Sequence, residues 1–185
     1  MPAWPEISSS LYGAWRLARG DRDGMNYMNL SIDGFWRSFF AAVLAAPAYL
    51  LILLIQHTSM DMEMSWLPDL SSYVLGWICW PLVALGLTRM MGLAHNYIPY
   101  IITYNWANLV HISFLLPIAL ITHGQVLPQG LAAMVGLVAT LAVLVYLWWV
   151  TRVALGASAG IAIGFVVLDV LLGFLLSHGT DRLFS

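Results

Sequence analysis

Apolar residues fall in five long runs along the chain, and the segments between them hold most of the charged residues. Each run is close to the roughly 20 mostly apolar residues that a helix needs to cross a bilayer. The runs show no sustained in–out alternation of the kind found in membrane β-barrels. The pattern therefore predicts an all-α integral membrane protein whose five transmembrane helices form one bundle, at residues 35–55, 73–93, 97–121, 130–150 and 157–176.

The residues before the first span, 1–34, form an amphipathic segment that we expect to be cytoplasmic. One of the serines at 8–10 can cap a short helix on which Leu11, Tyr12, Trp15 and Ala18 share a face. Such a pattern is typical of an interfacial helix with its aromatic rings at headgroup depth. We expect it to anchor the bundle, and docking of a partner is the alternative. Residues 35–178 form the transmembrane domain, and 179–185 a short outer tail.

Composition supports a membrane location, since 61% of the residues are hydrophobic and only 9% are charged. Soluble domains average about 25% charged residues. Every basic residue is an arginine, and six of the seven fall on one side if the N-terminus is cytoplasmic and the C-terminus periplasmic. The absence of lysine is typical of a GC-rich genome, so we expect a bacterial inner membrane.

The third span contains an unusually polar segment, NYIPYIITYNWANLVH at 96–111. At about 100° per residue, Tyr104, Asn108 and His111 lie on one stripe of a helix, with Asn105 beside it. Polar groups face lipid only at high cost, so we expect this stripe to face the interior of the bundle. Two interpretations remain open: hydrogen bonds that hold helices together, or a hydrated cavity or proton path.

Asp169 lies near the middle of the last span, in GFVVLDVLLGFLL. A carboxylate at this depth costs at least about 2.5 kcal/mol unless it is neutral, paired or hydrated. We expect His111 or Asn108 to be its partner, because Arg89 lies near the cytoplasmic end of its span and can reach the interface. The contact would be either a proton-relay site or a stabilising buried pair.

Small residues at four-residue spacing mark the start of the last span, at Gly156, Gly160 and Gly164. This spacing lets two helix backbones approach closely in a membrane. The glycines therefore predict a helix-packing face, on which a second copy of the chain or another membrane subunit could bind.

The loop after the first span contains His57, Met60, Met62 and Met64. Imidazole and thioether groups are ligands for copper(I), which makes these residues candidates for a metal site. An ordinary interfacial loop anchored by Trp66 is the alternative that we favour. The sequence therefore predicts no metal site and no cofactor.

The leading functional hypothesis is a non-enzymatic helix-packing subunit or scaffold that is embedded in the lipid bilayer as part of a membrane assembly. The second is a proton-linked channel or transporter for a small polar solute, with a path lined by Asp169, His111, Asn108 and Tyr104. Motifs for a nucleophile or a phosphate-binding loop do not occur, and the few arginines follow membrane topology. A membrane enzyme is therefore the least favoured of these classes, and we expect no nucleic-acid partner.

A third hypothesis comes from the tripeptide Leu11-Tyr12-Gly13 in the N-terminal segment, together with five spans and a short outer tail. This layout is similar to that of Yip1-type membrane proteins, which act with small GTPases in eukaryotic vesicle trafficking. In the family's longer signature a proline follows the glycine, whereas Ala14 follows here. The resemblance implies a membrane-organising protein, and no site residue is carried over.

Overall fold

The computed structural model describes residues 1–60, 66–124 and 126–184, and the regular elements within them are all helices. The N-terminal part contains α1 (Trp4–Ala18), the 3₁₀ helix η1 (Arg22–Tyr27) and α2 (Ile32–Ser38). The long helices are α3 (Phe40–Met60), α4 (Trp66–Met90), α5 (Tyr97–His123), α6 (Gln129–Leu155) and α7 (Ala159–Phe184), with the 3₁₀ helix η2 (Ala94–Asn96) before α5.

Within the described residues, five helical stretches are long and apolar enough to cross a membrane, which confirms the predicted number of spans. The first combines α2 with α3, and the others are α4, η2 with α5, α6 and α7. α4 begins at Trp66, before the predicted start at 73, because Pro68 fits a first helical turn and Asp69 is favourable near a helix N-terminus. α7 runs on to Phe184, through most of the segment predicted as a short tail.

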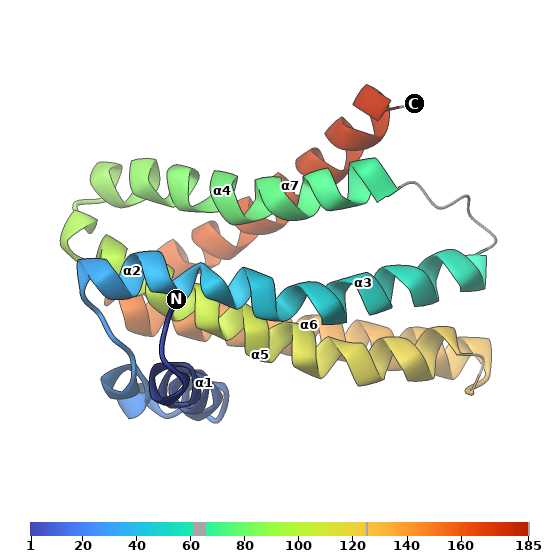
Figure 1. Cartoon of the computed structure of the whole chain (residues 1–185), viewed down its shortest axis with the longest axis horizontal. Coiled ribbons are helices and arrows are strands. Elements are labelled where there is room, and N and C mark those ends of the chain that lie inside the picture. The colour runs from blue at the N-terminus through green and yellow to red at the C-terminus, as the bar shows by residue number, and fades with distance from the viewer. Residues whose placement is uncertain (61–65, 125, 185) are drawn as a thin grey trace.

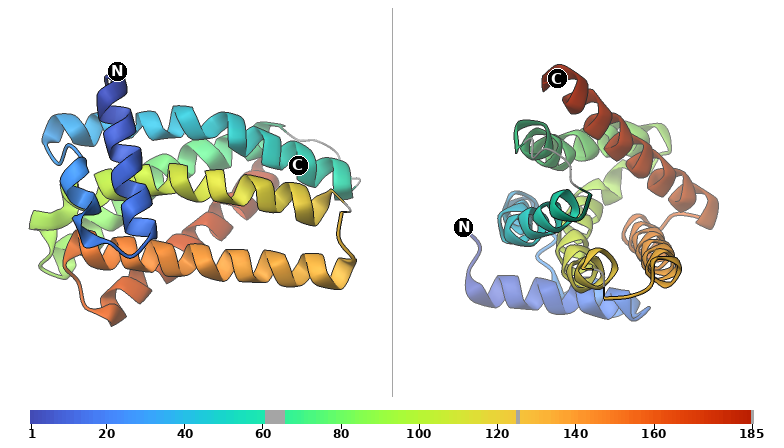
Figure 2. Two further views of the ribbon diagram at one scale, coloured as in Figure 1. Left: turned by 90° about the horizontal axis from the view of Figure 1, so that it is seen from below. Right: turned by 90° about the vertical axis from the view of Figure 1, so that its right-hand side faces the viewer.

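The long helices form a bundle, which Figure 1 shows from the side and Figure 2 also shows end-on. α3 packs against α5, α5 against α6, α6 against α7, and α7 against α4. α3 and α4 approach each other closely at few points, and long side chains bridge them. A seam therefore runs between α3 and α4.

α1 crosses α5 and α6 at one end of the bundle (Figure 2). Ala14 and Leu17 are buried there, and Tyr146 Oη on α6 donates a hydrogen bond of 2.9 Å to the Ala14 carbonyl. Tyr12 and Trp15, from the face predicted to meet headgroups, are exposed. We call this end of the bundle the α1 end, and the opposite end, where α3 and α7 finish, the far end.

Glycines fix the packing of η1 on α1. A Cβ at Gly13 would lie 2.4 Å from the Gly24 carbonyl oxygen, and a Cβ at Gly24 would lie 2.4 Å from the Gly13 carbonyl oxygen. Only glycine permits so close an approach. Glu6 then joins α1 to the following segment, because it accepts hydrogen bonds from Arg37 at 2.9 Å and from Asn29 Nδ2 at 3.1 Å.

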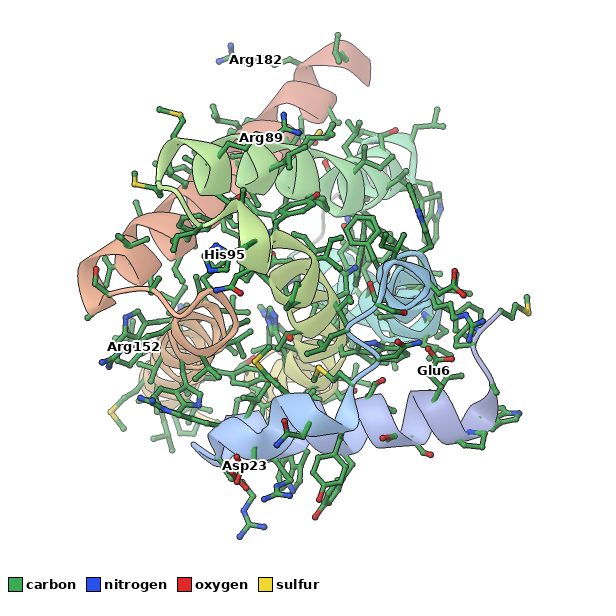
Figure 3. The ribbon with its side chains drawn as sticks, turned by 90° about the vertical axis from the view of Figure 1, so that its left-hand side faces the viewer. Glu6, Asp23, Arg89, His95, Arg152 and Arg182 are labelled. Carbon is green, nitrogen blue, oxygen red and sulfur yellow. The ribbon has the colours of Figure 1, made fainter. Side chains whose placement is uncertain are left out.

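Arginines and tryptophans gather at the α1 end. Figure 3 looks onto this end and shows Arg89 and Arg152 near the ends of α4 and α6. The Arg152 guanidinium lies over the Trp148 ring at 5.5 Å, and that of Arg22 lies over the Trp149 ring at 5.2 Å. Such cation–π contacts let a basic residue stay beside an apolar surface.

Candidate functional site

A cavity of about 510 Å³ lies between α3, α4, α5 and α7. Each helix lines it with residues three or four positions apart, the spacing that places side chains on one helical face. All five members of the predicted intramembrane polar cluster line this cavity: Tyr104, Asn105, Asn108, His111 and Asp169.

Asp169 accepts a hydrogen bond from Tyr104, whose Oη lies 2.7 Å from Oδ2. This pairing differs from the predicted one, because His111 Nδ1 lies 3.3 Å from Asn108 Oδ1 on the same helix. α7 crosses the bundle obliquely (Figure 1), so Asp169 is level with Tyr104 and not with His111, about two turns farther along α5. The intramembrane carboxylate therefore has a hydroxyl donor.

Asn105 has a different role from its neighbours in the cluster. Its side chain is only 1% exposed, and its Nδ2 donates a hydrogen bond of 2.9 Å to Ser38 Oγ at the end of α2. Asn108 and His111 remain half-buried at the cavity wall. Asn105 therefore holds α5 against α2, and the other polar groups of α5 border the open space.

A second carboxylate, Asp69, borders the far part of the cavity. His57 Nε2 lies 3.1 Å from Asp69 Oδ2, and Tyr49 Oη donates a hydrogen bond of 3.2 Å to the Asp69 carbonyl. The Tyr49 and Tyr73 rings stack with centroids 4.5 Å apart, and Tyr73 Oη donates to the Ala42 carbonyl at 2.6 Å. These contacts bridge the seam between α3 and α4.

The sequence carries a signal for this far part that the predicted second span misses. That span begins at residue 73 and so leaves out Asp69, which shares a helical face with residues that follow it. The cavity-lining residues of α4 repeat at three- and four-residue spacing: Asp69, Ser72, Tyr73, Gly76, Trp77 and Trp80. Helical periodicity could therefore have extended the predicted site to α4.

An aromatic cluster closes the cavity toward the α1 end. We call it the aromatic floor: Trp80, Tyr100 and Phe165, with the Tyr104 ring packed beside Trp80 and Tyr100. The Phe165 ring meets the rings of Tyr100 and Trp80 edge to face, with centroids 5.7 and 6.2 Å apart. Phe165, Trp80 and Tyr100 are at most 2% exposed. Within the part of the chain that is described, Trp80 Nε1 and Tyr100 Oη have no hydrogen-bond partner.

α4 and α7 are joined near the far end by a pair of hydroxyl groups. Ser72 Oγ lies 2.6 Å from Thr180 Oγ1, and Ser72 also lies 3.4 Å from the Leu176 carbonyl oxygen. Thr180 is buried, with 3% of its surface exposed. These bonds hold the two helices together beside the cavity.

The predicted glycine face is divided between two helices. Gly156 caps the end of α6 with a φ of 61°, a left-handed conformation that favours glycine. A Cβ at Gly160 or Gly164 on α7 would meet no heavy atom within 4 Å. These two glycines therefore present an uncovered face, and a partner helix on it stays a prediction.

The copper candidates are described only in part. His57 lies within an ion-pair distance of Asp69, while Met62, Met64 and the side chain of Met60 lie outside the described residues. Within the described ranges, no three His, Cys, Asp or Glu residues are grouped so that they could hold a metal ion. The methionine loop therefore stays an untested candidate.

Comparison with known proteins finds no matching family model, curated protein or solved structure. The resemblance to Yip1-type proteins therefore rests on the five-span layout and on Leu11-Tyr12-Gly13 alone. A functional assignment has to come from the cavity and its chemistry.

Proposed function

We propose that this chain takes a small solute into the cavity from the far end and carries it across the membrane, coupled to a proton held at Asp169. One observation supports this above all: polar side chains from α5 and α7 converge on a single cavity. A scaffold would use such groups in contacts between helices. Tyr104 and Asn105 do contact other helices, but Asn108 and His111 contact each other at the cavity wall.

In the proposed orientation the α1 end faces the cytoplasm and the far end faces outward, in a bacterial inner membrane. The arginines at the α1 end support it, because basic residues favour the cytoplasmic side. The exposed Tyr12 and Trp15 of α1 support an interfacial position for that helix, with both rings among the headgroups.

The cavity has the features of one state of an alternating-access carrier. The aromatic floor separates Asp169 from the α1 end, and the Tyr49–Tyr73 stack lies at the seam. In the proposed cycle, Asp169 releases its proton to the far side when the solute binds while the cavity is open to the far end. The floor then opens toward the α1 end, the solute leaves there, and Asp169 takes up a proton from that side.

Cysteine accessibility tests whether the cavity is open to water. Cys79 is the only cysteine, so Cys79→Ser gives a thiol-free background. Ile112→Cys and Ser177→Cys, both in the cavity lining, should react with an impermeant maleimide added on the far side of sealed vesicles. Val145→Cys, on the exposed surface of α6, is the lipid-facing control. Equal labelling at all three positions would refute an open cavity.

Proton flux tests the coupling to Asp169. Liposomes that contain the protein, a pH-sensitive dye and a trapped small polar solute should acidify faster than empty liposomes under an imposed inward proton gradient, because each solute molecule that leaves exchanges for a proton that enters. Asp169→Asn should abolish the difference, while Asp181→Asn, an exposed change on the same helix, should preserve it. Flux that survives Asp169→Asn would remove this residue from the proton path.

The uncovered glycines of α7 favour a second function, assembly with another helix. Close helix packing in membranes uses small residues at four-residue spacing, and Gly160 and Gly164 have that spacing. Gly160→Leu with Gly164→Leu should then dissociate a complex seen by native mass spectrometry. Gly130→Leu on α6, also in open space, is the matched control. A complex that survives the double change would exclude this face as the interface.

A further inference from the structure

The solute itself can be inferred from the charges and rings that line the cavity. We infer that the ligand is a small organic cation with an apolar part, such as an amine or a quaternary ammonium that carries hydrocarbon groups. This inference rests on the proposed solute-binding function and adds the chemical class of the solute.

The charge balance of the lining is the first argument. Asp69 and Asp169 line the cavity, and none of the described lining residues is an arginine. The chain contains no lysine, so no other permanent cation is available. An anion would meet two carboxylates with only the imidazoles of His57 and His111 as basic groups near the cavity, whereas a cation would neutralise the carboxylates.

The position of Asp169 is the second argument. Its hydrogen-bond donor is the Tyr104 hydroxyl, a neutral group, and no arginine forms an ion pair with it among the described residues. Asp69 is the carboxylate closer to the seam, and its Oδ2 lies 3.1 Å from His57 Nε2. A carboxylate inside a membrane is costly without a counter-charge. A bound cation would supply that counter-charge most effectively at Asp169.

Aromatic walls are the third argument. Tyr49, Tyr73, Trp77 and Trp80 line the same cavity as the two carboxylates. The faces of aromatic rings attract cations, and tryptophan does so most strongly. Rings together with a carboxylate are the usual means of recognising ammonium groups that carry carbon substituents.

Size separates an organic cation from a metal ion. The cavity of about 510 Å³ falls within the range of roughly 300–1,000 Å³ for organic ligand sites. A bare metal ion requires several ligand atoms around one point, and no group of three His, Cys, Asp or Glu side chains suited to a metal occurs in the described ranges. The lining therefore fits a larger ligand with a single positive charge.

Two probes of the same shape and opposite charge test the inference. Tetraphenylphosphonium is a cation, and tetraphenylborate is its anionic counterpart. In the Cys79→Ser, Ile112→Cys protein, the cation should slow maleimide labelling of the cavity at a concentration at least tenfold lower than the anion does. Equal protection by both probes, or protection by neither, would overturn the inference.

Changes at the carboxylates locate the bound charge. Asp169→Asn should raise the protecting concentration of tetraphenylphosphonium at least tenfold, Asp69→Asn should raise it less, and the exposed Asp181→Asn should leave it unchanged. Unchanged protection in Asp169→Asn would overturn the assignment. If Asp169→Asn does not fold, the comparison of the cationic and anionic probes in the protein that keeps both carboxylates still tests the inference.

The same assay separates failure of the inference from failure of the proposed function. If Ile112→Cys is not labelled faster than the Val145→Cys control, the cavity is closed to water and the proposed function fails. If Ile112→Cys is labelled and the two probes protect it equally or not at all, the solute-binding cavity stands and the cationic ligand is wrong.

Discussion

Two tyrosines on consecutive turns of α5 show how the half of the bundle toward the far end differs from the half toward the α1 end. Tyr104 Oη, beside the cavity, donates a hydrogen bond to Asp169 at 2.7 Å. Tyr100, one turn closer to the α1 end, is fully buried in the aromatic floor, and its hydroxyl has no partner within the described chain. The same residue type therefore serves as a polar donor in one half and as packing material in the other.

Side-chain size on the neighbouring helices explains this difference. Gly76 and Gly173 line the cavity, and a Cβ at either position would meet no heavy atom within 4 Å. One turn from Gly76, α4 carries Trp80, and two turns from Gly173, α7 carries Phe165, both at most 2% exposed. Glycine leaves the far half hollow, and large rings fill the half toward the α1 end. This order of residues places the cavity in the far half.

Among the substitutions that test this difference between the two halves, removal of a ring from the aromatic floor should change the free energy of unfolding most. Phe165→Ala should lower the free energy of unfolding by about 3–5 kcal/mol, the usual cost of deleting a buried phenyl ring. Phe174→Ala on the same helix is the control, because that side chain is 60% exposed and should cost much less. Unfolding of both variants in mild detergent measures the difference, and equal losses would mean that the floor is not a packed core.

The two tyrosines should respond in opposite directions to loss of the hydroxyl group. Tyr104→Phe should destabilise the protein by about 1–3 kcal/mol, because the half-buried Asp169 loses its donor. Tyr100→Phe should be neutral or stabilising by about 1 kcal/mol, because it removes a buried hydroxyl that lacks a partner. A loss of stability in Tyr100→Phe as large as in Tyr104→Phe would show that Tyr100 has a hydrogen bond as well.

Much of this architecture could be predicted from the sequence, because a bilayer dictates the length and polarity of each span. The polar cluster of α5 could be predicted as inward-facing for the same reason: Asn108 and His111 cannot face lipid cheaply. That Asp169 and the α5 cluster line one cavity follows from the same cost.

The partner of Asp169 could not be predicted, because it depends on how α7 is tilted across α5. Hydropathy carries no information on tilt, which is set by packing against neighbouring helices. The far part of the cavity was missed for another reason: the predicted second span begins at residue 73, whereas Asp69 already lies in the first turn of α4. The uncovered face at Gly160 and Gly164 shows that small-residue spacing alone does not identify the helix that packs there.

A substitution at a glycine of the far half should change the free energy of unfolding least. Gly76→Ala should stabilise the protein by about 0.5–1 kcal/mol, because alanine is a better helix former than glycine and its Cβ would enter open space. Thermal unfolding in detergent, with and without tetraphenylphosphonium, measures both stability and occupancy. The added methyl group narrows the cavity by little, so protection by the cation should change less than twofold.

Gly13→Ala should change stability in the opposite direction to Gly76→Ala, since its Cβ would lie 2.4 Å from the Gly24 carbonyl oxygen. This variant should be destabilised because α1 and η1 would have to separate, and the cavity should keep its affinity for the cation. If Gly76→Ala is destabilised as Gly13→Ala is, another helix must cover the α4 face. The far half would then be an interface in an assembly, and the scaffold hypothesis would replace solute transport.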